Sequence, residues 1–93
     1  MFVGYETNNN TNVNEYDKTK FIAIKIILND KSTYKFITTQ FLINSGRFMI
    51  SFDEINEHMG ISNSYTFNRK YIVLIKQKEC SSYDEALHVK ENM

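Results

Sequence analysis

The 93-residue sequence lacks the features that identify several common classes of protein. It contains a single cysteine, Cys80, which excludes an internal disulfide framework and makes a cytoplasmic setting the expectation. Its longest apolar stretch, Phe21–Leu28, is interrupted by Lys25 and is too short to cross a bilayer. The position of that stretch does not suit a signal peptide either. We therefore expect no association with a membrane.

An excess of charge of one sign is also missing. Eleven Lys and Arg residues balance eleven Asp and Glu residues, so the simplest argument for nucleic-acid binding, a strongly basic chain, does not apply. The three glycines, Gly4, Gly46 and Gly60, are too dispersed to form a glycine-rich loop for phosphate. A neutral chain can still carry a local basic patch.

Residues that carry catalysis or bind metals are sparse. His58 and His88 share no metal-ligand spacing with Cys80, and a zinc site needs more ligands in recognisable pairs. The sequence around Cys80 does not place a basic side chain next to its thiol, so we expect a partly buried structural thiol. We expect no catalytic residue, no metal and no cofactor, and hence a protein that is not an enzyme.

The composition divides the chain in two. Residues 1–18 have few apolar side chains and include five asparagines between Thr7 and Glu15, a residue type that favours turns and coil. The sequence predicts a flexible Asn-rich arm over residues 1–18 and a single globular domain over residues 19–93. The bias toward Asn, Ile, Lys and Tyr is typical of an AT-rich genome, such as that of a low-GC bacterium or one of its phages or plasmids.

The first half of the domain favours strands. Apolar residues at every second position from Ile22 to Leu28 predict a strand over Lys20–Leu28, ended by a turn at Asn29–Ser32. The stretch Tyr34–Ile43 fits either the second strand of a hairpin or a helix. A turn at Asn44–Arg47 and a short strand at Phe48–Ile50 follow.

The second half favours helices. Ser51 and Glu54 fit a capping box that begins a helix ending at Gly60. A second helix, capped by Ser62 or Asn63, extends to about Gln77, although the β-branched run Tyr71–Ile75 is also compatible with a strand. Ser82 caps a last helix that ends at about Glu91.

The segment Phe52–Thr66 resembles a helix-turn-helix motif. Phe52, Ile55 and Met59 form the apolar stripe of the first helix, Gly60 supplies the left-handed turn, and Ile61 fills the corner between the helices. The resemblance covers residues 48–77 and is to winged-helix domains of phage and plasmid regulators and replication proteins. It implies a small, single, winged-helix-like α+β domain with a short β-sheet, two or three helices and a helix-turn-helix at 51–77.

The resemblance also implies a function, sequence-specific binding of double-stranded DNA in transcriptional regulation or replication control. The exposed front of the second helix would then read bases. The base-reading residues implied are Ser62, Asn63, Ser64, Phe67 and Asn68. Phosphate contacts would come from Arg69, Lys70 and Lys76, which lie in a stretch without acids that also fits a solvated helix face.

Oligomeric state and partner have alternatives. A module this small usually dimerises, and the last helix, Ser82–Glu91, either forms the homodimer contact or packs on its own core. The competing function is that of a small phage or plasmid protein that binds and inhibits a host protein. In that case the strand Lys20–Leu28 would pair with an edge of the partner.

Overall fold

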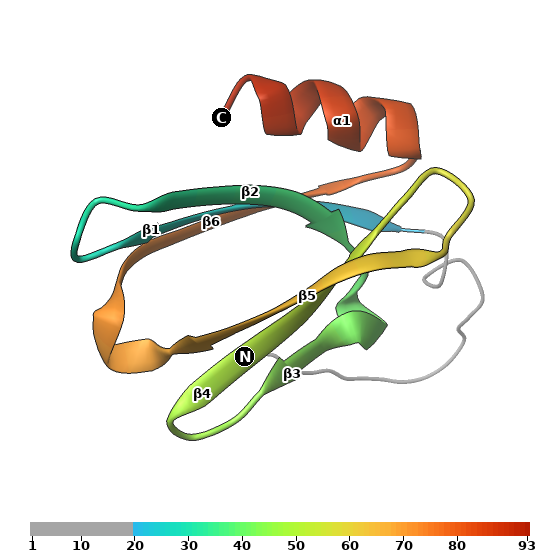
Figure 1. Ribbon diagram of the computed structural model, residues 1–93. Coiled ribbons are helices and arrows are strands. Elements are labelled where there is room, and N and C mark those ends of the chain that lie inside the picture. The colour runs from blue at the N-terminus through green and yellow to red at the C-terminus, as the bar shows by residue number, and fades with distance from the viewer. Residues whose placement is uncertain (1–19) are drawn as a thin grey trace.

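The computed structural model describes residues 20–93, and the arm predicted over residues 1–18 lies outside the described residues. Over this range, six strands form two antiparallel three-stranded sheets, and one helix covers the outer face of the first sheet (Figure 1). The strands are β1 (Phe21–Leu28), β2 (Thr33–Thr38), β3 (Ile43–Ser45), β4 (Met49–Ile55), β5 (Ile61–Asn68) and β6 (Ile72–Cys80). Two 3-10 turns, η4 (Gln40–Leu42) and η5 (Arg69–Tyr71), and the helix α1 (Tyr83–Glu91) complete the fold.

The first sheet has the strand order β2-β1-β6 and confirms the strand predicted over Lys20–Leu28. The alternating side chains Ile22, Ile24 and Ile26 are buried on its inner face, as a period of two requires. The stretch Tyr34–Ile43, which the sequence left open, is mainly the hairpin partner β2 followed by η4. Because β1 pairs on both sides, neither of its edges is available to a partner protein.

The two helices predicted over residues 51–77 are wrong. The second sheet, in the order β3-β4-β5, contains β4 where the first helix was expected, and the second helix is replaced by β5, η5 and the start of β6. The domain is therefore mostly β, and residues 20–93 contain neither a helix-turn-helix nor a winged-helix arrangement of two or three helices.

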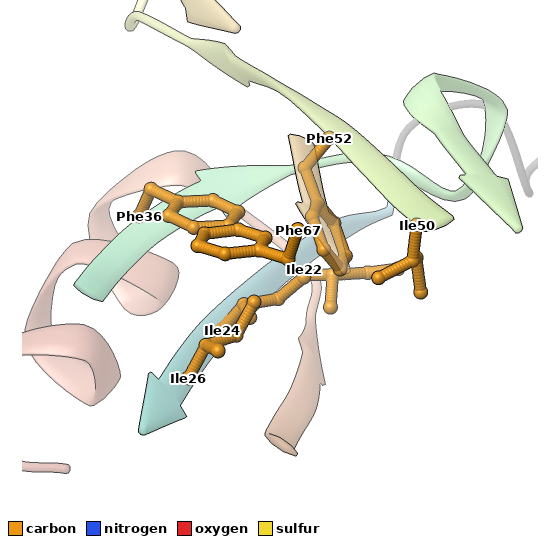
Figure 2. Close-up of a cluster of buried hydrophobic side chains, with 7 residues drawn as sticks. All are labelled: Ile22, Ile24, Ile26, Phe36, Ile50, Phe52 and Phe67. Carbon is orange, nitrogen blue, oxygen red and sulfur yellow. The ribbon is translucent and has the colours of Figure 1, made fainter. Parts of the chain in front are cut away.

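The core between the sheets explains this outcome. Side chains from both sheets converge on one cluster (Figure 2), in which the rings of Phe36 and Phe52 lie 5.3 Å apart between centroids. Ile50 and Phe52 enter this cluster at strand spacing. The pairing register then shifts between Glu54 and Ile55, and Ile55 joins a second cluster. Burial of both Phe52 and Ile55, three residues apart, thus imitates the stripe of a helix.

The turn predicted at Gly60 also differs. Gly60 does not adopt a positive φ, whereas its neighbour Met59 does, at 68°. The carboxamide oxygen of Asn56 accepts hydrogen bonds from the N–H groups of His58 (2.9 Å) and Gly60 (3.0 Å), which shapes a β4–β5 hairpin. Ile61 begins β5 with its side chain 57% exposed, so it fills no corner between helices.

The last predicted helix is confirmed as α1. The Ser82 hydroxyl accepts a hydrogen bond from the Glu85 N–H (3.1 Å), which caps the first turn. Ala86 is fully buried against the first sheet, in the cluster that includes Ile37 and Cys80. The helix α1 thus packs on its own core. No helix within residues 20–93 is long and apolar enough to span a membrane.

Candidate nucleic-acid interface

Charged side chains gather at opposite ends of the domain. At one end the β4–β5 turn lies beside the start of α1 (Figure 1), and this acidic end carries Glu54, Glu57, Asp84 and Glu85. The two regions interact, because the charges of Glu57 and Glu54 add to burial in raising the pKa of Tyr83. At the other end are the β1–β2 turn, the β3–β4 turn and η5. This basic end carries Lys31, Arg47, Arg69 and Lys70.

Hydrogen bonds join the three turns of the basic end. The Asn29 N–H donates to the Tyr71 carbonyl, and the Arg69 N–H donates to the Phe48 carbonyl, both at 2.8 Å. The Arg69 guanidinium donates from Nε to the Gly46 carbonyl (2.8 Å) and from Nη2 to the Ser45 hydroxyl. Segments distant in the sequence are therefore held as one surface.

One acid, Asp30, shares this end. Its carboxylate accepts a hydrogen bond from the Ser32 N–H (2.9 Å), and hydrogen bonding to Ser32 lowers its pKa. It therefore remains ionised at neutral pH and offsets one of the four cations. The basic end keeps a net positive charge.

Two exposed aromatic rings distinguish the basic end. Phe48 is 67% exposed, and the Arg47 guanidinium carbon lies 5.3 Å from its ring centroid. Tyr71 is 46% exposed, and the Lys70 ammonium lies 5.2 Å from its centroid. Cations near a ring face are attracted by its quadrupole, and exposed rings beside cations are the components of single-strand binding surfaces. These two rings were not among the residues predicted to be functional, although each directly follows its cation in the chain.

The predicted base-reading residues lie on β5 rather than on a helix. Phe67 is only 7% exposed and packs in the core with Phe52, so its ring is not presented at the surface. Asn63 donates to the Glu54 carboxylate (3.2 Å), and Ser64 donates to that of Asp53 (2.7 Å). These pairs link β5 to its neighbour β4.

The two remaining base-reading candidates also have partners within the chain. The hydroxyl of Ser62 donates to the main-chain oxygen of Glu54 (3.4 Å). The carboxamide oxygen of Asn68 accepts from the Lys70 N–H (3.1 Å), which shapes the start of η5. Of the five candidates, only Asn68 adjoins the basic end.

The predicted phosphate contacts are divided between two places. Arg69 and Lys70 lie together on η5, at the basic end. Lys76 lies on β6 directly beside Lys25 of β1, which in turn lies beside Lys35 of β2. These three residues form a row across the first sheet, the lysine row. Lys25 donates to the main-chain oxygen of Met93 (2.9 Å).

Cys80, the cysteine considered for chemistry in the sequence, is buried and free. Burial raises the pKa of the Cys80 thiol, and the nearby charge of Glu85 adds to this effect, so the thiol stays protonated at neutral pH. Over residues 20–93, no three side chains of His, Cys, Asp or Glu gather in a way that would hold a metal ion.

No family model, no curated protein and no solved structure matches the chain. Its function must therefore be inferred from the described side chains.

Proposed function

We propose that the protein binds nucleic acid through its basic end. The observation that carries the proposal is the pair of exposed rings, Phe48 and Tyr71, each with a cation near its face, on turns joined by hydrogen bonds. Every base has a π-face that stacks on such a ring, and the cations neutralise phosphates. A zero net charge does not oppose this, because four of the acids, Glu54, Glu57, Asp84 and Glu85, lie at the opposite end.

The surface fits unpaired bases better than a duplex groove. A major groove is read by an inserted helix or a two-stranded ribbon, and base edges are read by its polar side chains. The basic end instead presents flat rings, and the only helix of residues 20–93 packs on the first sheet. Binding of single strands with little sequence preference suits a cytoplasmic factor in replication control.

The test is fluorescence anisotropy with a labelled single-stranded oligonucleotide and its duplex, at low and at moderate salt. We expect tighter binding of the single strand. Three cations, Lys31, Arg47 and Lys70, have no hydrogen-bonded partner among the side chains described at this end. If they contact phosphates, log K should fall with log salt at a slope of about −2, since each single-strand phosphate contributes about −0.7.

The decisive variants remove the rings and the cations separately. Phe48→Ala and Tyr71→Ala should each weaken single-strand binding about 5- to 150-fold, the range expected for loss of one stacked base. The double variant Arg47→Ala, Lys70→Ala should weaken binding and make the salt slope shallower.

A matched control removes two cations elsewhere. Lys20 lies near the acidic end, 3.4 Å from Glu79, and Lys78 lies on β6. The double variant Lys20→Ala, Lys78→Ala removes two positive charges, so its net charge equals that of Arg47→Ala, Lys70→Ala. Equal losses in the two double variants would show that only net charge matters. That result, or the absence of binding at low salt, contradicts the proposal.

A further inference from the structure

The strand β5 forms an edge that lacks the usual protection against pairing. No strand within residues 20–93 pairs with its outer side, and none of its eight residues is charged. The other edges carry the features that natural edge strands use. β3 has only three residues, β2 carries Lys35, and β6 carries Lys76, Lys78 and Glu79. β5 is thus the described edge best suited to accept another strand.

The pairing of β5 with β4 determines which main-chain groups of β5 remain available on its outer side. The hydrogen bond from the Arg69 N–H to the Phe48 carbonyl fixes which residues turn their main chain toward β4. Along a strand of an antiparallel pair, the main-chain N–H and carbonyl groups of successive residues point alternately to one side and the other. Those of Phe67 and Tyr65 therefore point toward β4, while those of Thr66 and Ser64 point outward. The outward groups form a row that an added strand can pair with.

The charge distribution indicates which strand is added. β5 begins after the turn that carries Glu57, whose side chain is 68% exposed, and it ends at Arg69 and Lys70. A second copy paired antiparallel would bring the acidic turn of each copy to the η5 of the other. Both ends of the added pair would then be electrostatically complementary.

We propose that two copies of this chain associate through β5, in antiparallel orientation, and join their second sheets into one continuous sheet. Directly opposed residues of an antiparallel pair have side chains on the same face of the sheet, so the two-fold axis must pass at a residue rather than between two residues. The residues at the centre of β5 are Ser64 and Tyr65, and the axis passes at one of them. The proposal does not rest on nucleic-acid binding, because it uses the free edge and the charges of the two ends only.

Pairing of one strand per copy covers a small area compared with about 1,600 Å² for a standard interface. We therefore expect a weak, concentration-dependent dimer rather than an obligate one. Sedimentation velocity of the full chain, freed of nucleic acid, should show a shift from monomer to dimer between micromolar and submillimolar protein.

The first variant blocks the edge. Thr66→Lys places a charge on the exposed outer face of β5, within two residues of the two-fold axis, where a lysine on an edge strand opposes pairing, and it should abolish the dimer. Asn44→Lys adds the same charge to the same face on β3, at the opposite edge of the sheet, and should leave the dimer intact. Circular dichroism confirms that both variants fold.

The second test reverses the charges at the strand ends. Glu57→Lys should weaken the dimer about 2- to 30-fold, the effect of losing two exposed ion pairs of up to about 1 kcal/mol each. Adding Lys70→Glu should restore self-association, which no purely structural role of either residue would produce.

Two outcomes overturn the proposal. One is a wild-type protein that stays monomeric through the whole concentration range. That result would also be expected if β5 pairs with a different protein instead of a second copy. The other is a dimer that Thr66→Lys and Asn44→Lys weaken equally. Both readouts are independent of the anisotropy measurement, so failure here leaves the proposed nucleic-acid binding standing.

Discussion

Lys31 and Met59 hold the same position in two hairpin turns, and both have a left-handed backbone, with φ of 75° and 68°. In the β1–β2 turn the Lys31 N–H donates to the Leu28 carbonyl (2.8 Å), and in the β4–β5 turn the Met59 N–H donates to the Asn56 carbonyl (3.0 Å). This is a turn closed by a left-handed residue, a position that glycine usually occupies in hairpins. The backbone of both residues therefore adopts a conformation that costs free energy when the residue is not glycine.

Replacing Met59 by asparagine should stabilise the protein. A Cβ atom costs about 1–2 kcal/mol in the left-handed region, and the short polar side chain of asparagine offsets part of this cost by local hydrogen bonding, which methionine cannot do. Met59 is half-exposed, so little packing is lost. We expect Met59→Asn to raise the free energy of unfolding by about 0.5–1 kcal/mol in urea titrations.

The control for this prediction is Met59→Ala, which shortens the side chain but lacks the carboxamide that favours the left-handed region. It should give no gain. A stabilisation by alanine as large as that by asparagine would show that the side chain, and not the backbone, is unfavourable at this position.

The same turn shows why the sequence predicted the wrong conformation at Gly60. A glycine after an apolar stripe commonly marks a left-handed helix end, yet here it follows the left-handed residue by one position. A Cβ atom added at Gly60 would lie 3.3 Å from the Asn56 side-chain nitrogen, so close packing rather than a positive φ restricts this position. Local composition does not distinguish these two reasons for a glycine.

How much the sequence predicted depended on whether local signals agreed with long-range pairing. β1 and α1 were predicted correctly, because alternation in one and a serine cap in the other match their tertiary surroundings. The Ser51–Glu54 box had the same local form as a helix start, but pairing with β5 overrode it.

The candidate site was only half predictable. Arg69 and Lys70 were identified from their local charge, whereas Arg47 and Phe48 join them only because the β3–β4 turn bonds to η5. These segments are more than twenty residues apart in the sequence. No periodic pattern in the sequence predicts such a contact. The rings of Phe48 and Tyr71 lie in stretches whose sequence is typical of ordinary strands.

The lysine row should destabilise the fold. Lys25 lies directly opposite both Lys35 and Lys76, and like charges in that arrangement repel. We expect Lys35→Gln to raise the free energy of unfolding by about 0.2–1 kcal/mol at low salt. Lys78→Gln, opposite Ala23, should have a smaller effect. The difference should vanish in about 1 M salt, where the Debye length is about 3 Å. Its persistence there would refute an electrostatic origin.

Two serines that the sequence assigned as helix caps should now respond differently to alanine. Ser82 caps α1, so Ser82→Ala should lower the free energy of unfolding by about 1 kcal/mol. Ser62 lies exposed on β5, and Ser62→Ala should change it by less than about 0.5 kcal/mol. Urea titration of both variants provides the comparison, and equal losses would contradict the strand assignment of residues 61–68.

Stability should decline at alkaline pH. Burial raises the pKa values of Tyr65, Cys80 and Tyr83 above their ordinary values of 10.0, 9.0 and 10.0. The unfolded chain then loses these protons at lower pH than the folded chain, so their contribution is fully present below about pH 9 and is lost as pH rises through the folded values.

The variant Tyr65→Phe isolates one of these groups. Besides burial, the hydrogen bond from the Tyr65 hydroxyl to the Glu54 carboxylate (3.1 Å) keeps this phenol protonated. Removing the hydroxyl should lower stability at neutral pH, because the hydrogen bond is lost, and should make the decline above pH 9 shallower. Tyr71→Phe is the matched control, since that hydroxyl belongs to a ring exposed at the basic end. Urea titrations from pH 7 to 11 measure both slopes. If Tyr65→Phe declines as steeply as Tyr71→Phe, the folded structure does not hold the Tyr65 proton, and the Tyr65–Glu54 bond between β5 and β4 contributes nothing to the alkaline transition.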